Sequence, residues 1–187
     1  MGGMQIDPAP PSNQSDGPAR LLIVEPNRGA LSVLAKRLGE AGYRIVACEN
    51  ASNATAEMLR NPVDLVLAEL RMAPVSGVEL TRLIRDDTML KDTPVILITG
   101  RTDSSGAVDG FAAGADDVVA KPFHFEVLAA RIARRIARAR SVKELRADNA
   151  TLDARVVTRA IELGEIRAAL MQSEAERLRL QQLIIRD

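Results

Sequence analysis

The sequence has no tryptophan, and aromatic residues make up only 2% of its 187 positions. Its core must therefore be built from aliphatic side chains, and few rings are available to stack on nucleic-acid bases. Lys and Arg together number 25, as do Asp and Glu, so no net charge draws the chain to nucleic acid or to an anionic membrane. We therefore expect neither a nucleic-acid partner nor a membrane partner.

The single cysteine, Cys48, excludes an internal disulfide and is expected to be a buried structural thiol. No apolar run approaches the roughly 18 residues that a membrane-spanning helix needs. The N-terminus also lacks the charged start and apolar stretch of a signal peptide. These features predict a cytoplasmic protein.

Three regions follow one another along the chain. Residues 1–19 are rich in Gly, Pro, Ser and Asn, which predicts a disordered tail. Residues 20–140 alternate short apolar runs with amphipathic stretches, which predicts an α/β domain built on a doubly wound, five-stranded parallel sheet. Residues 141–187 contain no Pro and only one Gly, so the last helix is expected to continue to the C-terminus.

The apolar periodicity assigns the individual elements of this domain. Strands are expected at 21–24, 43–47, 64–68, 94–98 and 117–120. Helices are expected at 28–41, 51–60, 77–86, 104–113 and from Phe123 onward, the last with Val127, Leu128, Ile132 and Ile136 on its buried face.

Four polar residues lie at or just beyond the ends of predicted strands. Glu25 follows the first strand, Glu69 the third, Thr99 the fourth and Lys121 the fifth. Right-handed crossovers place the carboxyl ends of parallel strands at one edge of the sheet. We therefore expect these four side chains to converge at that edge.

Several segments of this region resemble the receiver domain of bacterial two-component response regulators, over about residues 20–140. The matching segments are Leu21–Asn27, Asp64–Met72, Pro94–Gly100, Gly114–Asp117 and Lys121–Phe123. The resemblance implies a flavodoxin-like (βα)5 fold. In that family a histidine kinase transfers a phosphoryl group to an aspartate, assisted by a divalent cation.

The resemblance places Glu69 at the position of the phosphate-accepting aspartate. Its carboxylate lies one methylene further from the backbone, so we expect it to project into the phosphoryl space and to pair with Lys121. Thr99 and Lys121 match the hydroxyl and the ammonium that bind phosphoryl oxygens. Glu25 matches the first acidic metal ligand, but Pro26 replaces the second and offers no side-chain oxygen. Mg²⁺ binding is expected to be weak or absent, and no other cofactor is expected.

Two further departures concern how phosphorylation would be reported. Val118 stands where the family usually has an aromatic residue that changes rotamer, and the usual Met-Pro pair reads Met72-Ala73-Pro74. Acceptor, metal ligand and reporter are thus changed together, which predicts a phosphorylation-independent pseudo-receiver and not an enzyme. Two alternatives stay open: a working phospho-receiver in which another acid compensates, and an ion-pair cluster without regulatory meaning.

A heptad pattern in the extension predicts a parallel coiled-coil dimer with a second copy of this chain. Arg159, Ser173 and Arg177 interrupt the seam, and the register is expected to slip after Leu170. A solvent-facing single helix is the alternative. The seam has Val142, Asn149, Val156, Leu163, Leu170 and Ile184 at a, and Leu145, Leu152, Ile166 and Leu180 at d.

A basic stretch at the start of the extension leaves a DNA-binding regulator as a further alternative. It contains Arg131, Arg134, Arg135, Arg138, Arg140 and Lys143. Their helical spacing favours a solvated flank of the dimer helix, and no helix-turn-helix pattern follows. His124, just before this stretch, is expected to be an exposed loop residue.

The extension resembles, weakly, the helical linkers that join receivers to output domains. Such outputs include cyclic-di-GMP enzymes and kinases. The apolar pattern continues to residue 187, so we expect an output domain to follow. A histidine kinase or another signalling protein is the expected upstream partner.

Overall fold

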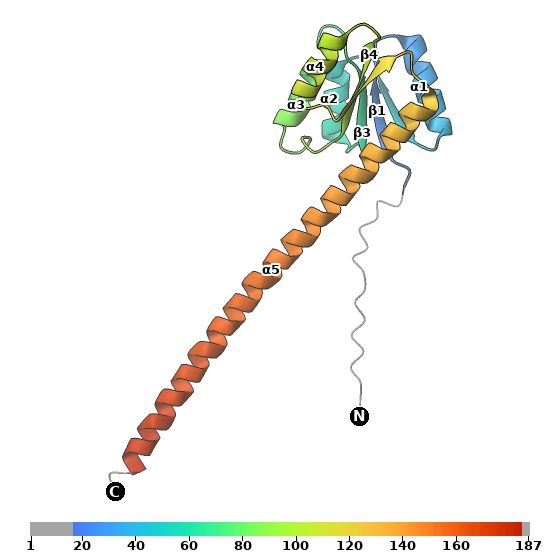
Figure 1. The fold of residues 1–187 in the computed structure, drawn as a ribbon. Helices are drawn as coiled ribbons and strands as arrows, with labels where there is room; N and C mark the ends of the chain where they lie inside the picture. Colours follow the sequence, from blue (N-terminus) through green and yellow to red (C-terminus); the bar gives the residue numbers. More distant parts are fainter. Residues whose placement is uncertain (1–16, 185–187) are drawn as a thin grey trace, which may run out of the picture. The chain divides into compact units, whose positions relative to one another are not determined.

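The structure is a computed structural model that describes the backbone of residues 17–184 and the side chains of residues 17–175 and 177. Strands and helices alternate along the chain (Figure 1). They are β1 (Arg20–Val24), α1 (Arg28–Glu40), β2 (Arg44–Cys48), α2 (Ala51–Arg60), β3 (Leu65–Glu69), α3 (Gly77–Asp86), β4 (Val95–Gly100), α4 (Ser104–Ala112), β5 (Asp117–Lys121) and α5 (Phe125–Ile184).

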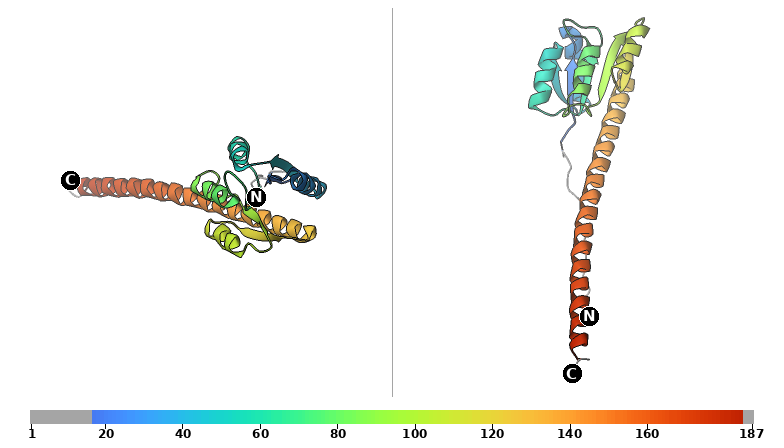
Figure 2. Two further views of the ribbon diagram at one scale, coloured as in Figure 1. Left: turned by 90° about the horizontal axis from the view of Figure 1, so that it is seen from above. Right: turned by 90° about the vertical axis from the view of Figure 1, so that its left-hand side faces the viewer.

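The strands form one parallel sheet in the order β2-β1-β3-β4-β5. Helices α1 and the first turns of α5 cover one face, and α2, α3 and α4 cover the other (Figure 1 and Figure 2). The predicted doubly wound, flavodoxin-like fold is therefore confirmed.

The sheet is buried on both faces, which explains its continuous apolar runs. Successive strand side chains point to opposite faces. In β1, Leu21 and Ile23 belong to the apolar cluster with α1 and α5, whereas Leu22 and Val24 belong to the cluster with α2 and α3. All four are at most 1% exposed.

Local capping side chains explain where the helices of the domain begin and end. The N-cap side chains of Asn27, Asn50, Ser76 and Asp103 accept hydrogen bonds from backbone N–H groups in the first turns of α1, α2, α3 and α4. Gly42 follows α1 with a φ of 92°, a conformation that favours glycine and ends the helix as predicted.

Two details of the predicted last helix were wrong. Helix α5 begins at Phe125 and not at Phe123, whose side chain packs against the core from the preceding loop. Val127 is 49% exposed, while Leu128 and Ile132 are fully buried. Because adjacent helical residues point about 100° apart, Val127 lies away from the line of Leu128 and Ile132.

Cys48 lies one residue beyond the predicted strand and is the last residue of β2. Its side chain is buried, as expected, and burial raises the pKa of the thiol, with a smaller contribution from the carboxylate of Glu57. Cys48 is therefore a poor nucleophile at neutral pH.

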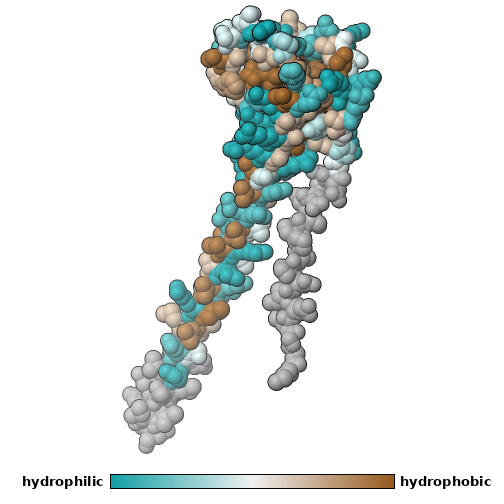
Figure 3. Space-filling view, turned by 45° about the vertical axis from the view of Figure 1, so that its right-hand side comes forward, coloured by the Kyte–Doolittle hydropathy of each residue, from teal (hydrophilic) through white to brown (hydrophobic). Residues whose placement is uncertain are grey.

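The chain divides into two compact units between Ala137 and Arg138; from sequence we placed this boundary between residues 140 and 141. The second unit is helical from Arg138 to Ile184. The seam residues with described side chains are all exposed in the single chain, and apolar side chains recur along the helix (Figure 3). The side chains of Leu180 and Ile184 lie outside the described residues. Among the residues that are described, no helix is long and apolar enough to cross a membrane.

Candidate functional site

The candidate site lies at the carboxyl edge of the sheet. Glu25 directly follows β1, Glu69 ends β3 and Lys121 ends β5, while Thr99 is the last residue but one of β4. Strand pairing aligns Glu69 with Ile98 and Thr99 with Ala120, so these strand ends lie side by side.

Lys121 joins the two glutamates in one cluster. Its Nζ donates to Glu69 Oε2 at 2.6 Å and to Glu25 Oε2 at 3.0 Å. The predicted pairing of Glu69 with Lys121 is therefore present. The glutamate side chains are only 13% and 6% exposed, whereas that of Lys121 is 39% exposed. Two nearly buried carboxylates thus share one ammonium that remains in contact with solvent.

Further hydrogen bonding holds this cluster in place. The backbone N–H of Asn27 donates to Glu25 Oε1 at 3.0 Å, so both oxygens of Glu25 have partners. Burial by itself lowers the pKa of Lys121, but the hydrogen bonds to Glu69 and Glu25 outweigh it and raise that pKa above its usual value. Lys121 is consequently charged throughout the physiological pH range.

The donor set fits a divalent cation poorly. The two carboxylates already point an oxygen each at Lys121 Nζ, and Pro26, which follows Glu25, has no side-chain oxygen. Within the described part of the chain, no group of three or more His, Cys, Asp or Glu residues is arranged to hold a metal ion. A hard cation prefers six or more oxygen ligands, and its positive charge would oppose the ammonium.

A second ion pair lies beside the first and was not predicted from the sequence. Arg71, two residues after Glu69, donates to both carboxylate oxygens of Asp103 at 2.7 and 2.8 Å. Asp103 is also the N-cap of α4, where it accepts from the backbone N–H of Gly106 at 2.9 Å. Arg71 first, and then the Gly106 N–H, hold the pKa of Asp103 well below its usual range.

Thr99 lies beside this second ion pair. Its hydroxyl lies 3.5 Å from Asp103 Oδ2, and its side chain is buried. Asp103 before a helical stretch is a recognisable N-cap signal, but its partner Arg71 is 32 positions away in sequence. Only the folded loops bring the two residues together. Their ion pair joins the β3–α3 loop to the start of α4.

Val118 lies on β5 and packs against the apolar cluster beneath α4. Gly110 of α4 has no side chain there, and a Cβ at that position would lie 2.9 Å from Leu97 and 3.5 Å from Val118. The close approach of α4 to the sheet therefore depends on Gly110. Val118 fills this space as a small apolar residue with no polar group to reach the site.

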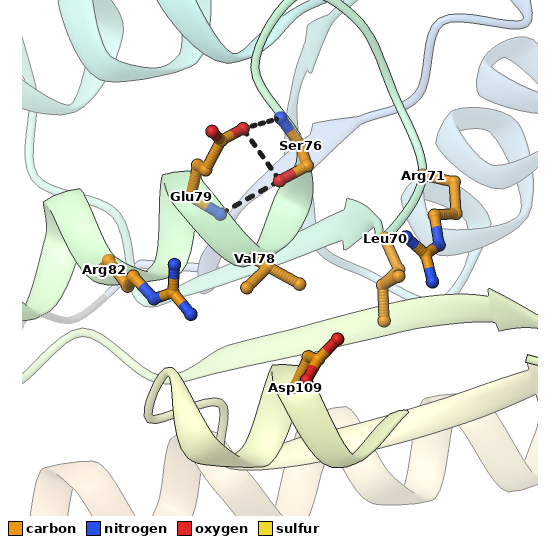
Figure 4. Close-up of a pocket in the computed structure, with 7 residues that line it drawn as sticks. All are labelled: Leu70, Arg71, Ser76, Val78, Glu79, Arg82 and Asp109. Atoms are coloured by element: carbon orange, nitrogen blue, oxygen red, sulfur yellow. Dashed lines mark hydrogen bonds between the residues drawn. The ribbon is translucent and has the colours of Figure 1, made fainter. Parts of the chain in front are cut away.

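An open pocket of about 340 Å³ lies between α3 and α4, next to the second ion pair (Figure 4). Its side chains include two arginines and two acids, so its charge is balanced. Ser76 and Glu79 bond each other there as the capping box of α3. The pocket is lined by Leu70, Arg71, Ser76, Val78, Glu79, Arg82 and Asp109.

Part of the basic stretch is used within the domain. Arg131 donates to both carboxylate oxygens of Asp117 at 2.9 Å, and Arg135 lies 3.6 Å from the same carboxylate. The prediction of a purely solvated flank is wrong for these two residues, because β5 brings the buried Asp117 beneath them. His124 is exposed in the loop before α5, as expected.

Comparison with known proteins gives consistent matches over the domain. A sequence model of the response regulator receiver domain matches residues 21–133. The transcriptional regulatory protein YvrH of Bacillus subtilis is 35% identical over 127 residues, which cover 67% of this chain and 52% of that protein. The two-component response regulator PhoP of Pseudomonas aeruginosa is 37% identical over 113 residues, covering 60% and 49%. The chain therefore spans about half the length of these relatives.

Solved structures give the same match. The receiver domain of a signal transduction histidine kinase from Syntrophus aciditrophicus is 29% identical, with a TM-score of 0.61 over 64% of this chain and 90% of that one. A response regulator receiver protein from Pseudomonas putida is 27% identical, with a TM-score of 0.59 over 63% and 98%. Both matches leave more than a third of this chain uncovered.

Proposed function

The chain belongs to the response regulator receiver family of two-component signalling, and we propose that it is a receiver whose phosphorylation switch has been replaced by a permanent ion pair. The contact of Lys121 with both Glu69 and Glu25 carries this proposal. The Glu69 carboxylate stands at the acceptor position and already neutralises the ammonium that would otherwise bind a phosphoryl oxygen. Glu69 therefore acts as a weak, fixed substitute for a phosphoryl group, with one charge and two oxygens.

Three features support phosphorylation independence. Glu69 replaces the acceptor, Pro26 denies a metal ligand, and the ammonium of Lys121 lies between the two remaining carboxylates. Phosphoryl transfer depends on positioning and on neutralising the developing charge. Because a metal ligand is missing, Mg²⁺ binding is weak or absent. Only Lys121 and Thr99 then remain to stabilise the developing charge, so phosphorylation is weak or absent as well. Val118 also lacks the ring whose rotamer change would report the transfer.

The output of this module is dimerisation through residues 141–187. The helix exposes apolar seam side chains, including Leu145 at 63%, Leu152 at 55% and Leu163 at 56%. Large apolar side chains at heptad spacing gain free energy when another helix covers them and removes them from water. A parallel dimer with a second copy would orient two output domains, such as cyclic-di-GMP enzymes or kinases. Its input would come from a histidine kinase or another cytoplasmic signalling protein, not from an activity of its own.

The working phospho-receiver is the second candidate, because Thr99 and Lys121 are both present at the sheet edge. Incubation with a small phosphodonor and Mg²⁺, followed by intact mass measurement, separates the two. We expect no added phosphoryl group on the wild-type chain and little on Glu69→Asp, because Pro26 still denies the metal. The double variant Glu69→Asp/Pro26→Asp should gain a labile phosphoryl group. A labile gain on the wild-type chain would refute the proposal.

The relatives include proteins named as transcriptional regulators, which favours a DNA-binding role for a longer form of this chain. Within the chain itself, Arg131 and Arg135 are already bonded to Asp117. We therefore expect no salt-dependent binding to duplex DNA, measured by fluorescence anisotropy at low salt. Steep salt-dependent binding would favour the DNA-binding alternative.

A further inference from the structure

The long helix has a second apolar face besides the heptad seam. Starting from Ala147, positions spaced alternately by three and four residues are all apolar or glycine, and all are exposed in the single chain. This second face lies about 150° around the helix axis from the heptad seam. It consists of Ala147, Ala150, Ala154, Val157, Ile161, Gly164, Ala168, Met171 and Ala175.

The second face is more regular than the seam. It contains no polar side chain over a length of about 42 Å, whereas Asn149, Arg159 and Ser173 interrupt the seam over the same stretch. Val157 and Ile161 are each 59% exposed and Met171 is 71% exposed. A single dimer through the seam would leave this face in water.

We propose that the second face binds another copy of this chain in the antiparallel direction, centred on residue 159. In this register Val157 of one copy lies against Ile161 of the other, and the relation repeats by symmetry. Ala154 then meets Gly164 at the next layer. Two β-branched side chains therefore meet at the centre, and small residues on either side let the helices approach closely.

The outer layers follow the same register. Ala150 lies against Ala168, and Ala147 lies against Met171, so each large side chain there faces a small one. A parallel arrangement would instead stack Gly164 on Gly164 and Met171 on Met171, leaving a gap at one layer and crowding at another. The volumes of the side chains along the face therefore favour the antiparallel direction.

The charges that flank the second face favour the same register. Heptads can also be counted along the second face, with Ala147 as a first core position. In an antiparallel pair the residue just before each first core position lies beside an equivalent residue of the other helix. This brings Asp153 beside Arg167 and Arg146 beside Glu174, each twice by symmetry. In a parallel pair Asp153 would lie beside Thr158, so its charge would gain no partner there. Charge complementarity thus identifies both the occupant and its direction.

This inference goes beyond the proposed function and does not depend on it. If the seam and the second face are both used, each parallel dimer presents two second faces on opposite sides, so dimers join into assemblies of four or more copies. If only the second face is used, the assembly is an antiparallel dimer. The two cases are distinguishable by mass in solution.

Disulfide trapping tests the direction. In a Cys48→Ala background, a protein with Ala147→Cys is mixed with one carrying Met171→Cys and oxidised, and the linked species are identified by intact mass. We expect the mixed dimer to dominate, because the register brings these positions together. Dominance of either self-linked dimer, or absence of any linked species, would overturn the proposal.

Two matched substitutions test the surface in the full-length chain. Ala168→Lys places a charge in the second face, whereas Ala169→Lys places the same charge on the neighbouring exposed alanine outside it. Sedimentation equilibrium should show association through the second face weakened about tenfold or more by Ala168→Lys, since an unpaired charge must be desolvated. Ala169→Lys should change it less than about twofold. Equal effects of the two variants would contradict the proposal.

A seam variant separates failure of this proposal from failure of the proposed dimer. Leu163→Glu lies in the seam and outside the second face. If both surfaces are used, the wild-type chain forms assemblies of four or more copies, Leu163→Glu alone is a dimer, and adding Ala168→Lys gives a monomer. If Leu163→Glu leaves the mass unchanged while Ala168→Lys gives a monomer, the seam dimer fails and the second face stands. Unchanged mass with Ala168→Lys refutes the second face, whatever the seam does.

Discussion

Replacing Lys121 with methionine tests the central ion-pair cluster most directly. The substitution keeps most of the apolar stem and removes only the ammonium, which lies 2.6 Å from Glu69 and 3.0 Å from Glu25. The two carboxylates are 13% and 6% exposed, so water can replace the lost cation only in part. The folded variant would therefore contain two neighbouring, poorly solvated negative charges.

The expected cost follows from the burial of the partners. Removing one member of a buried ion pair costs about 3–5 kcal/mol, whereas exposed pairs contribute about 0–1 kcal/mol. The Lys121 side chain is 39% exposed, so solvent screening reduces the buried figure. We expect Lys121→Met to lower the free energy of unfolding by about 2 kcal/mol at pH 7.

Urea unfolding of the full-length chain at one protein concentration measures this cost, with the exposed Lys36→Met as the matched control. Glu69→Gln combined with Lys121→Met should cost less than the two single changes added together. A loss within about 0.5 kcal/mol, as for an ordinary surface site, would refute the reasoning.

The dependence of stability on alkaline pH gives an independent check of the same cluster. The pKa of Lys121 is raised in the folded chain, because its hydrogen bonds to Glu69 and Glu25 outweigh the effect of burial. The stability that this shift contributes is therefore complete below the ordinary lysine value of about 10.5 and is lost as pH rises through the raised value. Wild-type stability should fall at alkaline pH more steeply than that of Lys121→Met.

Other changes near the site have distinct expected results. Gly77→Ala should destabilise the domain by about 1–3 kcal/mol in thermal unfolding, because the new Cβ would lie 2.5 Å from the backbone oxygen of Glu69; an unchanged melting temperature would contradict this close approach. Ser76→Ala should cost about 1 kcal/mol in the same measurement through loss of the α3 cap. Arg71→Gln should raise the depressed pKa of Asp103 toward its usual value in a carboxyl NMR titration. Because a depressed carboxyl pKa contributes stability that is lost as pH falls, this variant should lose less stability than wild type on acidification, and an unchanged pKa would remove Arg71 as the cause.

The strands and their common edge were predictable because burial on both faces leaves a strong sequence pattern. Leu21–Val24 is uniformly apolar since both faces of β1 are covered, and the turn residues around it define its ends. The limits of elements were less predictable. Phe123 has the apolar character of a helix residue, yet its side chain enters the core from a loop, and composition does not distinguish these two cases.

The candidate site was predictable only in part. The positions of Glu25, Glu69 and Lys121 followed from strand ends and parallel topology, which are properties of the chain order. The contact of Arg71 with Asp103 could not be found in the same way, because their loops follow different strands and neither residue belongs to a periodic pattern. The pairing of Asp117 with Arg131 was missed for another reason: Asp117 lies in β5 and Arg131 in α5, and periodicity does not show which charged side chains meet between two elements.

The sequence by itself determined the doubly wound sheet, the edge that holds the polar side chains, and the residue types at that edge, with Glu69 and Pro26 among them. These properties depend on side-chain type and order along the chain. Tertiary structure decided which charges meet: one ammonium between two glutamates, and Thr99 beside Asp103 rather than in that cluster. Which charges meet depends on the paths of the loops and on distances of a few ångströms. Hydrogen bonds and ion pairs are sensitive to such distances, whereas hydrophobic periodicity is not.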